Sequence, residues 1–577
     1  MPSEGIGIEG KASGPVWIDV RDQSVQVRDA SGLWGLDTYQ TQVEIWEEVA
    51  PGCGGGQHGQ MWSQQRPAVL TIGAAGENQT RLGSLVHGAG SGAGQGGFGG
   101  VWGSKNLKAI SVVGTGAVDV ADPNALMEAR LWAKGYGFDP DNPMPVTLAY
   151  AAFGGISGHD LIYPPNTPAR SWGCIGCHRC CRGRTGSSHG NESSCFDFGY
   201  YMGFDQMVHG QFTDVTLQAA DLVQIYGINS SALSGGILWL LALAQQGIAG
   251  PGMEIDTDLP FHLLGELEFV QQLIGKIVNR EGIGADLAEG FARAAESWGR
   301  LEQDLASGIL PLQYWGYSHH YDARTEVEWG YGSVIAERDS NEHDFNWPCY
   351  WMPSVHYLYG FEPPMSAEQL AQTIGQKCKP YCDPLMVDYS DQGIYSETMA
   401  KLVAWQKHYT RFWKHSILYC DWAYADFFNP YGPNLQGLTP EAEPKFLNAV
   451  TGQNLTFEEG MELGRRIWNL DRAIWILQGR HRDQEVFADY TYEIGAEPGH
   501  SAYEIPYVMP VHENGEWSYK SLGGRKLDRD SFEQWKTTYY LLEGWDPATG
   551  WPTRSTLESL GLGYVADELE SHGKLGG

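Results

Sequence analysis

The chain lacks the features that would place it in several common classes of protein. No apolar run reaches the roughly 18 residues of a membrane-spanning helix, and the longest, 232–244, contains Ser234, Gly235 and Gly236. The first residues, MPSEGIGIEG, have neither the basic nor the apolar segment of a secretory signal peptide. Basic residues are few, since 38 Lys and Arg stand against 70 Asp and Glu. With a net charge of −32, we expect a cytoplasmic protein with no membrane span and no nucleic-acid partner.

Cysteine is too sparse for a disulfide scaffold, but it is concentrated in one place. Ten cysteines in 577 residues fit metal ligation in a reducing compartment better than a disulfide framework. Cys174, Cys177 and Cys181 form a C-x2-C-x3-C run, which can hold three corners of an iron–sulfur cluster while a distant cysteine completes the site. With His178 the stretch also matches the C-x-x-C-H pattern of haem attachment, and structural zinc is a further alternative. The spacing favours iron–sulfur.

The first part of the chain has the pattern of β-strands, in which apolar and polar residues alternate between turn residues. This pattern predicts strands at 15–20 and 24–28, and further strands are expected at 67–72 and 107–113. A glycine-rich segment at 88–103 separates the last two, in a chain with 75 glycines and 22 tryptophans. Glycine lets a backbone approach a large ligand closely, so the segment is a candidate binding loop, although a cluster of tight turns is the alternative.

The rest of the chain has the pattern of helices. From Asp122 onward apolar residues recur at helical spacing, and Thr456-Phe-Glu-Glu459 is a capping box that begins a helix. A chain of this length is expected to form roughly two to four domains. We predict an α+β fold, with a β-sheet domain at 1–118 followed by two mainly α-helical domains at 119–330 and 331–577.

Six segments together point to one family. The most specific is Gly96-Gly-Phe-Gly-Gly-Val-Trp-Gly-Ser-Lys-Asn-Leu-Lys-Ala-Ile110. The others are 72–78, the cysteine run 174–181, 226–229, 451–471 and 544–562. In this order they resemble the aldehyde:ferredoxin oxidoreductase superfamily of tungsten bis-pyranopterin enzymes, whose glycine-rich signature is close to the first segment. One such match would be weak, whereas six in order extend the resemblance over nearly the whole chain.

The resemblance implies two cofactors. One is a 4Fe-4S cluster, and its implied ligands are Cys174, Cys177, Cys181 and Cys420, with Cys378 and Cys382 as competing candidates for the fourth position. The other is a tungsten or molybdenum bis-pyranopterin, with Mg²⁺ as a bridge between the pterin phosphates. The residues implied to contact it are Gly96, Gly97, Gly99, Gly100, Lys105, Asn106, Gly227, Asn229, Leu418 and Tyr419.

The chain also departs from the family's pattern. Its β domain begins where the second half of the family's first domain begins, so we expect a truncated N-terminal sheet, with the remainder missing or supplied by another chain. Gln95 stands where an arginine usually precedes the paired glycines, and Gln224 and Asn229 replace acidic residues. We therefore expect some of the polar contacts to the pterins to be altered or lost relative to the family.

The region after the cysteine run bears on the reaction. Aldehyde-oxidising members of the family place a glutamate where this chain has Cys195. A cysteine followed by Phe resembles the catalytic subunit of tungsten-type benzoyl-CoA reductases, in which that cysteine ligates the metal. The alternative is that Cys195 only packs and Glu192 is the acidic group. His159 is the remaining candidate for a proton donor, in a segment (141–174) much shorter than in those reductases.

We therefore predict an oxidoreductase that exchanges low-potential electrons with ferredoxin or an iron–sulfur partner subunit, in an oligomer. The substrate that we favour is an aromatic acyl-CoA that is reduced, and oxidation of an aldehyde to a carboxylate is the alternative. A third interpretation is a degenerate homologue that carries only the cluster and serves as an electron-transfer or scaffold subunit.

Overall fold

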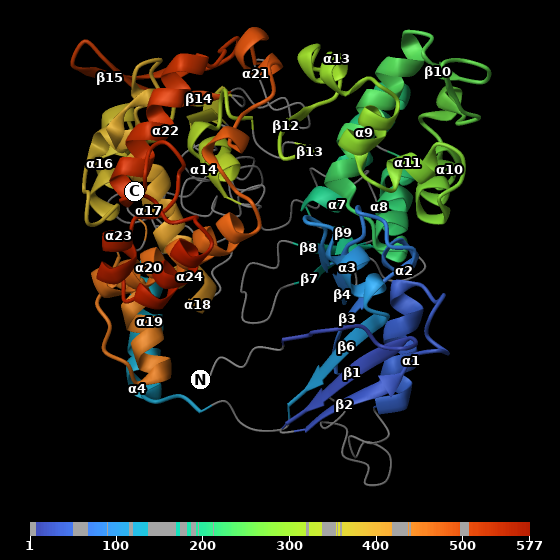
Figure 1. Ribbon diagram of the computed structural model, residues 1–577, viewed down its shortest axis with the longest axis horizontal. Helices are drawn as coiled ribbons and strands as arrows, with labels where there is room; N and C mark the ends of the chain where they lie inside the picture. Colours follow the sequence, from blue (N-terminus) through green and yellow to red (C-terminus); the bar gives the residue numbers. More distant parts are fainter. Residues whose placement is uncertain are drawn as a thin grey trace.

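The computed structural model describes most of the chain, in two lobes (Figure 1). The longer described stretches are 7–22, 24–49, 67–88, 91–114, 119–136, 195–211, 213–318, 322–336, 360–417, 440–496 and 507–577. Short pieces are described at 169–172, 182–185, 192–193, 353–354, 356–357 and 437. Of the described residues from 169 to 198, only the backbone is described.

One lobe contains a six-stranded sheet near the N-terminus. Its strands, in spatial order, are β2 (Ser24–Asp29), β1 (Val16–Arg21), β6 (Leu107–Val113), β3 (Ala68–Ile72), β4 (Leu85–His87) and β5 (Ser91–Ala93). Only β1 and β6 pair in parallel, and every other neighbouring pair in this sheet is antiparallel. The four predicted strands are therefore present, and the structure adds the two short ones.

A helix covers one face of this sheet. Helix α1 (Thr38–Val49) packs against β3 (Figure 1). The core between them contains Trp17, Ala30, Leu33, Ile45, Val49, Val69 and Ala109. Beside this core the buried ammonium of Lys108 pairs with the Glu77 carboxylate, at the end of the short helix α2 (Ala74–Glu77).

Next to the sheet, the same lobe continues as a group of helices. A small antiparallel sheet of β7 (Ala169–Trp172), β8 (Arg182–Thr185) and β9 (Glu192–Ser193) precedes them. The helices are α7 (Cys195–His209), α8 (Asp214–Tyr226), α9 (Ser230–Gln245), α10 (Leu267–Asn279), α11 (Gly284–Leu287), α12 (Phe291–Ser297) and α13 (Leu301–Ala306). In their shared core Trp239 stacks on Trp298 at 5.2 Å and donates to Asp304 at 2.8 Å.

The second lobe is also mainly helical (Figure 1). Its longer helices are α14 (Val327–Ile335), α16 (Ala367–Lys377), α17 (Glu397–Tyr409), α19 (Ala442–Thr451), α20 (Phe457–Leu477), α22 (Arg529–Glu543) and α24 (Gly563–Ser571). The predicted capping box at Thr456 begins α20 as expected. A short π-helix, Thr410–Lys414, continues α17. The α+β class predicted from the sequence is confirmed.

A buried cation ties α20 to the C-terminal part of this lobe. The guanidinium of Arg472 pairs with the Glu485 carboxylate and donates to the Gly550 carbonyl at 2.9 and 3.0 Å. It also lies 4.6 Å from the centre of the Trp545 ring. Arg472 and Glu485 are both fully buried, so each charge is compensated by the other and not by water.

The packing does not follow the predicted domain boundaries at every point. Helix α4 (Pro123–Lys134), placed by prediction in the second domain, packs against α19 of the other lobe, and the backbone amides of Ala121 and Asp122 donate to α19 carbonyls. Tyr314 belongs to the core of that lobe as well. The boundaries at 118 and 330 stay predictions. Among the described residues, we find no helix with the length and apolar character needed to cross a bilayer.

Candidate functional site

The glycine-rich segment forms a short helix that is packed backbone to backbone. Helix α3 (Phe98–Ser104) begins after Gly97, which has the left-handed φ of 68°. A Cβ at Gly103 would lie 1.9 Å from the Gly76 carbonyl oxygen, and one at Gly100 would lie 2.6 Å from the Thr80 oxygen. These glycines are therefore needed so that α3 can lie directly on α2 and the loop that follows it.

The turn between α8 and α9 joins the same arrangement. Gly227 ends α8 with a φ of 63°, and its carbonyl accepts from the Ser84 amide at 2.8 Å. The next turn residue but one, Asn229, donates its amide to the Leu82 carbonyl at 2.8 Å. The Asn229 side chain caps α9 by accepting from the Ala232 amide at 3.2 Å. Two segments about 130 residues apart in the sequence are thus held against one loop.

A cavity of about 700 cubic ångströms lies where these segments meet. From the glycine segment it is lined by Gly96, Gly97, Gly100, Val101 and Ser104, and from the turn by Asn229. Phe291, Ala292, Leu312 and Trp315 also line it. The predicted contact residues Gly96, Gly97, Gly100 and Asn229 therefore share one cavity.

The charged residues of this cavity are mostly arginines. Arg81, Arg280 and Arg293 line it together with a single carboxylate, Glu289. Glu289 accepts from Arg81 Nε at 3.0 Å and from an Arg280 terminal nitrogen at 2.6 Å. These two hydrogen bonds, first from Arg280 and then from Arg81, lower the pKa of Glu289. The carboxylate is thus ionised, and the cavity still has an excess of positive charge.

Other predicted contact residues lie outside the cavity lining. Lys105 donates its ammonium to the Gly10 carbonyl at 3.0 Å, and the Asn106 side chain donates to the Ala12 carbonyl at 2.7 Å. Both residues hold the segment that leads into β1. Gly99 and Gly227 are packing positions, since a Cβ on Gly99 would lie 2.7 Å from Ser84 O and one on Gly227 would lie 2.9 Å from Gly73 N.

Gln224, which replaces an acidic residue of the family, has a structural partner. Its side-chain oxygen accepts from the Tyr39 hydroxyl at 2.8 Å, and its backbone oxygen accepts from Thr38 Oγ1 at 2.8 Å. Gln224 is buried. An uncharged amide oxygen can accept this hydrogen bond without the cost of burying a carboxylate charge. The substitution therefore serves the contact between α8 and α1.

The predicted cluster ligands lie outside the described residues, as do His159, Leu418 and Tyr419. Glu192 lies in β9, and Cys195 is the first residue of α7, so their backbones are placed and their side chains are not described. Of the competing fourth ligands, Cys378 is fully buried in the core of the second lobe, and Cys382 is exposed. Within the described part of the chain, no group of three or more His, Cys, Asp or Glu is arranged to hold a metal.

The residues that are described fit the anionic part of the implied pterin cofactor. The cavity has the volume of a pocket for a sizeable ligand, and arginine is the side chain best suited to phosphate. Asn229 adds an amide that can donate or accept.

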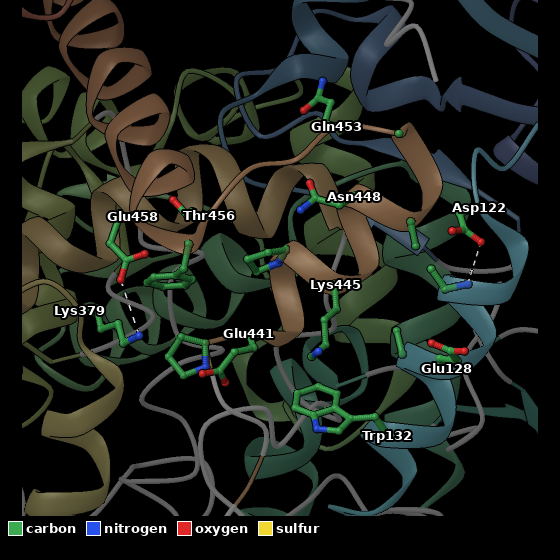
Figure 2. Close-up of a pocket in the computed structure, with 17 residues that line it drawn as sticks. Asp122, Glu128, Trp132, Lys379, Glu441, Lys445, Asn448, Gln453, Thr456 and Glu458 are labelled. Atoms are coloured by element: carbon green, nitrogen blue, oxygen red, sulfur yellow. Dashed lines mark hydrogen bonds and ion pairs between the residues drawn. The ribbon is translucent and has the colours of Figure 1, made fainter.

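A larger cavity of about 880 cubic ångströms lies in the other lobe, between α4, α19 and the start of α20 (Figure 2). There Lys445 lies 5.2 Å from the centre of the Trp132 ring, and Glu458 pairs with Lys379 at 3.6 Å. Its charges are mixed, and no predicted site residue lines it. The cavity beside α3 is therefore the better candidate.

The three arginines of that cavity were not identified from the sequence. Arg81 follows the second resemblance segment, whereas Arg280 and Arg293 come about 200 residues later. Arg280 has a left-handed φ of 58° at the end of α10, and periodicity gives no signal for such a position. Their meeting depends on tertiary structure, so no local pattern could have revealed it.

Similar proteins are found among both sequences and solved structures. A tungsten-containing aldehyde ferredoxin oxidoreductase from Pyrococcus furiosus is 27% identical over 508 residues, which cover 82% of this chain and 72% of that protein. The WOR-like subunit of an aliphatic sulfonate oxidoreductase from the same organism is 30% identical over 331 residues, 51% of this chain and 50% of that one. The active site complex BamBC of benzoyl coenzyme A reductase with 1,5-dienoyl-CoA has a similar fold, with a TM-score of 0.62, 21% identity, and coverage of 98% of this chain and 82% of that chain.

Family descriptions match both ends of the chain. The N-terminal domain of aldehyde ferredoxin oxidoreductase matches residues 3–114, and domains 2 and 3 of the same family match residues 155–562. The second match alone covers well over half of the chain. The protein thus belongs to the aldehyde ferredoxin oxidoreductase family.

Proposed function

We propose that the protein is a tungsten or molybdenum bis-pyranopterin oxidoreductase with one 4Fe-4S cluster. The observation that carries this proposal is the family match, which extends over residues 3–114 and 155–562 and includes relatives named as tungsten-containing enzymes. The cavity beside α3 supports it, because its arginines suit an anionic cofactor.

Two sets of residues would hold these groups. Cys174, Cys177, Cys181 and Cys420 would ligate the cluster. Gly96, Gly97, Gly100 and Asn229 would contact the pterin, with Mg²⁺ between its phosphates. When bound, a metal–pterin centre supplies two-electron chemistry, and the cluster passes the electrons singly. Ferredoxin or an iron–sulfur partner subunit would be the other party to this exchange.

Cys195 would act as a ligand to the metal. It begins a helix of 15 residues, and the N-terminus of a helix stabilises a thiolate. A thiolate is a soft ligand that suits these metals. His159 would hold the proton that an aromatic ring receives on reduction, since histidine titrates near neutral pH.

The substrate that we propose is an aromatic acyl-CoA, which would be reduced. The fold shared with the benzoyl-CoA reductase complex supports this choice, as does the cysteine at position 195. Oxidation of an aldehyde to a carboxylate is a second candidate, and it is favoured by the aldehyde oxidoreductases among the sequence relatives. In that case Glu192 would be the acidic group beside the substrate.

The cofactor proposal is tested by analysis of anaerobically purified protein for iron, tungsten, molybdenum and pterin. We expect about four iron atoms for each atom of tungsten or molybdenum, which is one cluster and one metal–pterin centre per chain. Cys177→Ser should abolish the broad visible absorbance of the cluster, whereas Cys180→Ser, in the same stretch, should leave it in place. Iron without tungsten, molybdenum or pterin would refute the proposal and favour the interpretation as a cluster-only subunit.

The substrate is tested on the same protein with two assays. Benzoyl-CoA is offered with a low-potential reductant, and an aldehyde is offered with an oxidising dye. Cys195→Ser should leave the cluster absorbance intact and remove the metal or the benzoyl-CoA activity. Aldehyde oxidation that survives in Cys195→Ser and is lost in Glu192→Gln would refute the acyl-CoA reading.

A further inference from the structure

A series of aromatic rings leads from the cavity beside α3 into the core of the second lobe. Trp315 lines that cavity, and the Arg480 guanidinium lies 4.1 Å from the centre of its ring. The same guanidinium lies 5.4 Å from the centre of the Trp475 ring on α20. One cation therefore lies against both a ring of the cavity and a ring of the second lobe.

Behind Trp475 the rings follow one another in direct contact. The Trp475 ring centre lies 5.5 Å from that of Trp468. Trp468 lies 5.9 Å from Trp545, and Trp545 lies 5.9 Å from Tyr539 on α22, which are ordinary spacings for aromatic pairs. Trp468, Trp545 and Tyr539 are fully buried, whereas Trp315 and Trp475 are half-buried. These five rings are called the aromatic path below.

The kind of side chain on the path suits electron transfer as well as packing. Packing needs apolar area, which Phe and Leu also supply. Tryptophan and tyrosine are the aromatic side chains that lose a single electron most readily, and phenylalanine is not oxidised under the same conditions. Because every ring of the path is Trp or Tyr, a missing electron can move from one ring to the next.

The two buried tryptophans are poor places for a missing electron to rest. Among the described residues, the Trp468 indole N–H has no hydrogen-bond partner. That of Trp545 donates at 2.8 Å to the Asn469 amide oxygen, which is a weak proton acceptor. An oxidised indole therefore keeps its positive charge. Three cations that repel such a charge lie 4.6–5.6 Å from these two ring centres: Lys407, Arg411 and Arg472.

Tyr539 differs because its proton has a place to go. Its hydroxyl donates to Glu543 Oε1 at 3.3 Å, and the same oxygen lies 3.0 Å from His408 Nε2. Both partners are buried. When Tyr539 loses an electron, its O–H bond breaks and the proton passes to the Glu543 carboxylate. The product is a neutral tyrosyl radical, which the nearby cations do not repel.

We propose that the aromatic path carries single oxidising equivalents from the cavity to Tyr539, where they are held as a tyrosyl radical. A one-electron oxidant derived from dioxygen takes an electron from Trp315, and each ring is refilled by the next until Tyr539 has lost one electron and one proton. A reductant in solution, such as ascorbate, returns the electron along the same rings, and Glu543 returns the proton. Only the source of the oxidant, a reduced metal centre that meets dioxygen, rests on the proposed function.

Flash photo-oxidation of the purified protein tests the path. A soluble ruthenium tris-bipyridine complex, excited beside an electron acceptor, becomes a one-electron oxidant, and EPR spectra distinguish tyrosyl from tryptophanyl radicals. Exposed tyrosines give a background that all variants share, so each variant is compared with wild type. We expect a long-lived tyrosyl signal that is lost in Tyr539→Phe and in Trp545→Phe. The control is Trp298→Phe, a tryptophan that stacks on Trp239 in the other lobe.

Two further variants sharpen the assignment. Tyr540 also lies 5.9 Å from the Trp545 ring centre, and its hydroxyl donates to Glu485. Loss of the signal in Tyr540→Phe but not in Tyr539→Phe would overturn the assignment to Tyr539. Glu543→Gln removes the proton acceptor and should lower the radical yield, which a purely structural role would not do. Equal signals in wild type, Tyr539→Phe and Trp545→Phe would show that the rings only pack.

A second measurement separates this inference from the proposed function. Reduced protein is exposed briefly to dioxygen, and the loss of the cluster absorbance is followed. We expect faster loss in Trp545→Phe than in wild type and in Trp298→Phe. Equal rates in all three would overturn the role of the path in the cavity. Protein without iron, tungsten, molybdenum or pterin would refute the proposed function, and the flash experiment would still decide the path.

Discussion

Gly103→Ala is the sharpest test of how α3 is held beside the cavity. A Cβ at this position would lie 1.9 Å from the Gly76 carbonyl oxygen and 2.8 Å from the Gly76 carbonyl carbon. Real contacts of this kind begin near 3.0 Å, so α3 and α2 would have to separate by about 1 Å. Both atoms belong to backbone, and no flexible side chain can yield instead.

Two effects oppose each other in this variant. Alanine gains about 1 kcal/mol over glycine in helix propensity, whereas forced overpacking costs typically about 1–3 kcal/mol and sometimes more. The overlap is large and rigid, so we take the upper end and expect a net loss of about 2 kcal/mol in local stability. A separation of the two helices would also disturb Glu77, which pairs with the buried Lys108 next to this contact.

Hydrogen–deuterium exchange of peptides that cover 98–113 measures this local stability directly. A loss of about 2 kcal/mol corresponds to roughly 30-fold faster exchange in the affected amides. The control is Gly114→Ala, since a Cβ there meets nothing within 4 Å. Exchange in Gly103→Ala that is unchanged, or slower as propensity alone would give, would refute the packing argument.

Further predictions concern buried charges, and thermal or denaturant unfolding over a range of pH checks each of them. Glu77→Gln should destabilise the protein by about 3–5 kcal/mol. Burial lowers the pKa of Lys108 below 10.5, so the free energy of unfolding should rise with pH between the lowered pKa and 10.5. The destabilisation caused by Glu77→Gln should shrink in the same pH range. Burial raises the pKa of Glu443 to about 8. The contribution of its protonated carboxyl to the free energy of unfolding is therefore complete below about pH 4.5 and is lost as the pH rises through 8. Glu443→Gln should remove this pH dependence of stability. Glu485→Gln leaves the buried Arg472 charge uncompensated and should cost about 3–5 kcal/mol, whereas an equal stability of this variant would contradict the burial argument.

Four strands of the sheet were predictable because each is a short run rich in apolar residues between turn residues. Strands β1 and β2 correspond to the alternating runs, and β3 and β6 correspond to the runs predicted at 67–72 and 107–113. Burial does not follow the alternation in β2, since Val25 and Val27 are 63% and 68% exposed. The short strand β4 precedes the glycine-rich segment and β5 lies within it, and both have too few residues for alternation to show. Helix α1 was missed for a different reason. Threonine and glutamine occupy several of its buried positions, so apolar residues do not recur clearly at helical spacing.

The closeness of the glycine segment and the turn at 226–229 was predicted through the family resemblance, and the structure places both at one cavity. Local patterns could not indicate the arginines, because Arg81 and Glu289 are 208 residues apart. Nor could they indicate that Lys105 and Asn106 turn to the N-terminal segment. The left-handed φ of 59° at Asn106 is a property of the chain's path and not of the residue type alone.

The structure separates two properties that the glycine signature seems to join in the sequence. The glycines at 99, 100 and 103 are explained by close backbone contacts with the loops beneath them, and this requirement would hold without any ligand. The positive charge of the cavity comes from arginines on other elements. It follows that the signature identifies a scaffold, while the charge of the cavity is set by residues on other elements. A substitution at these glycines therefore tests the scaffold, whereas a substitution at the arginines tests the charge of the cavity.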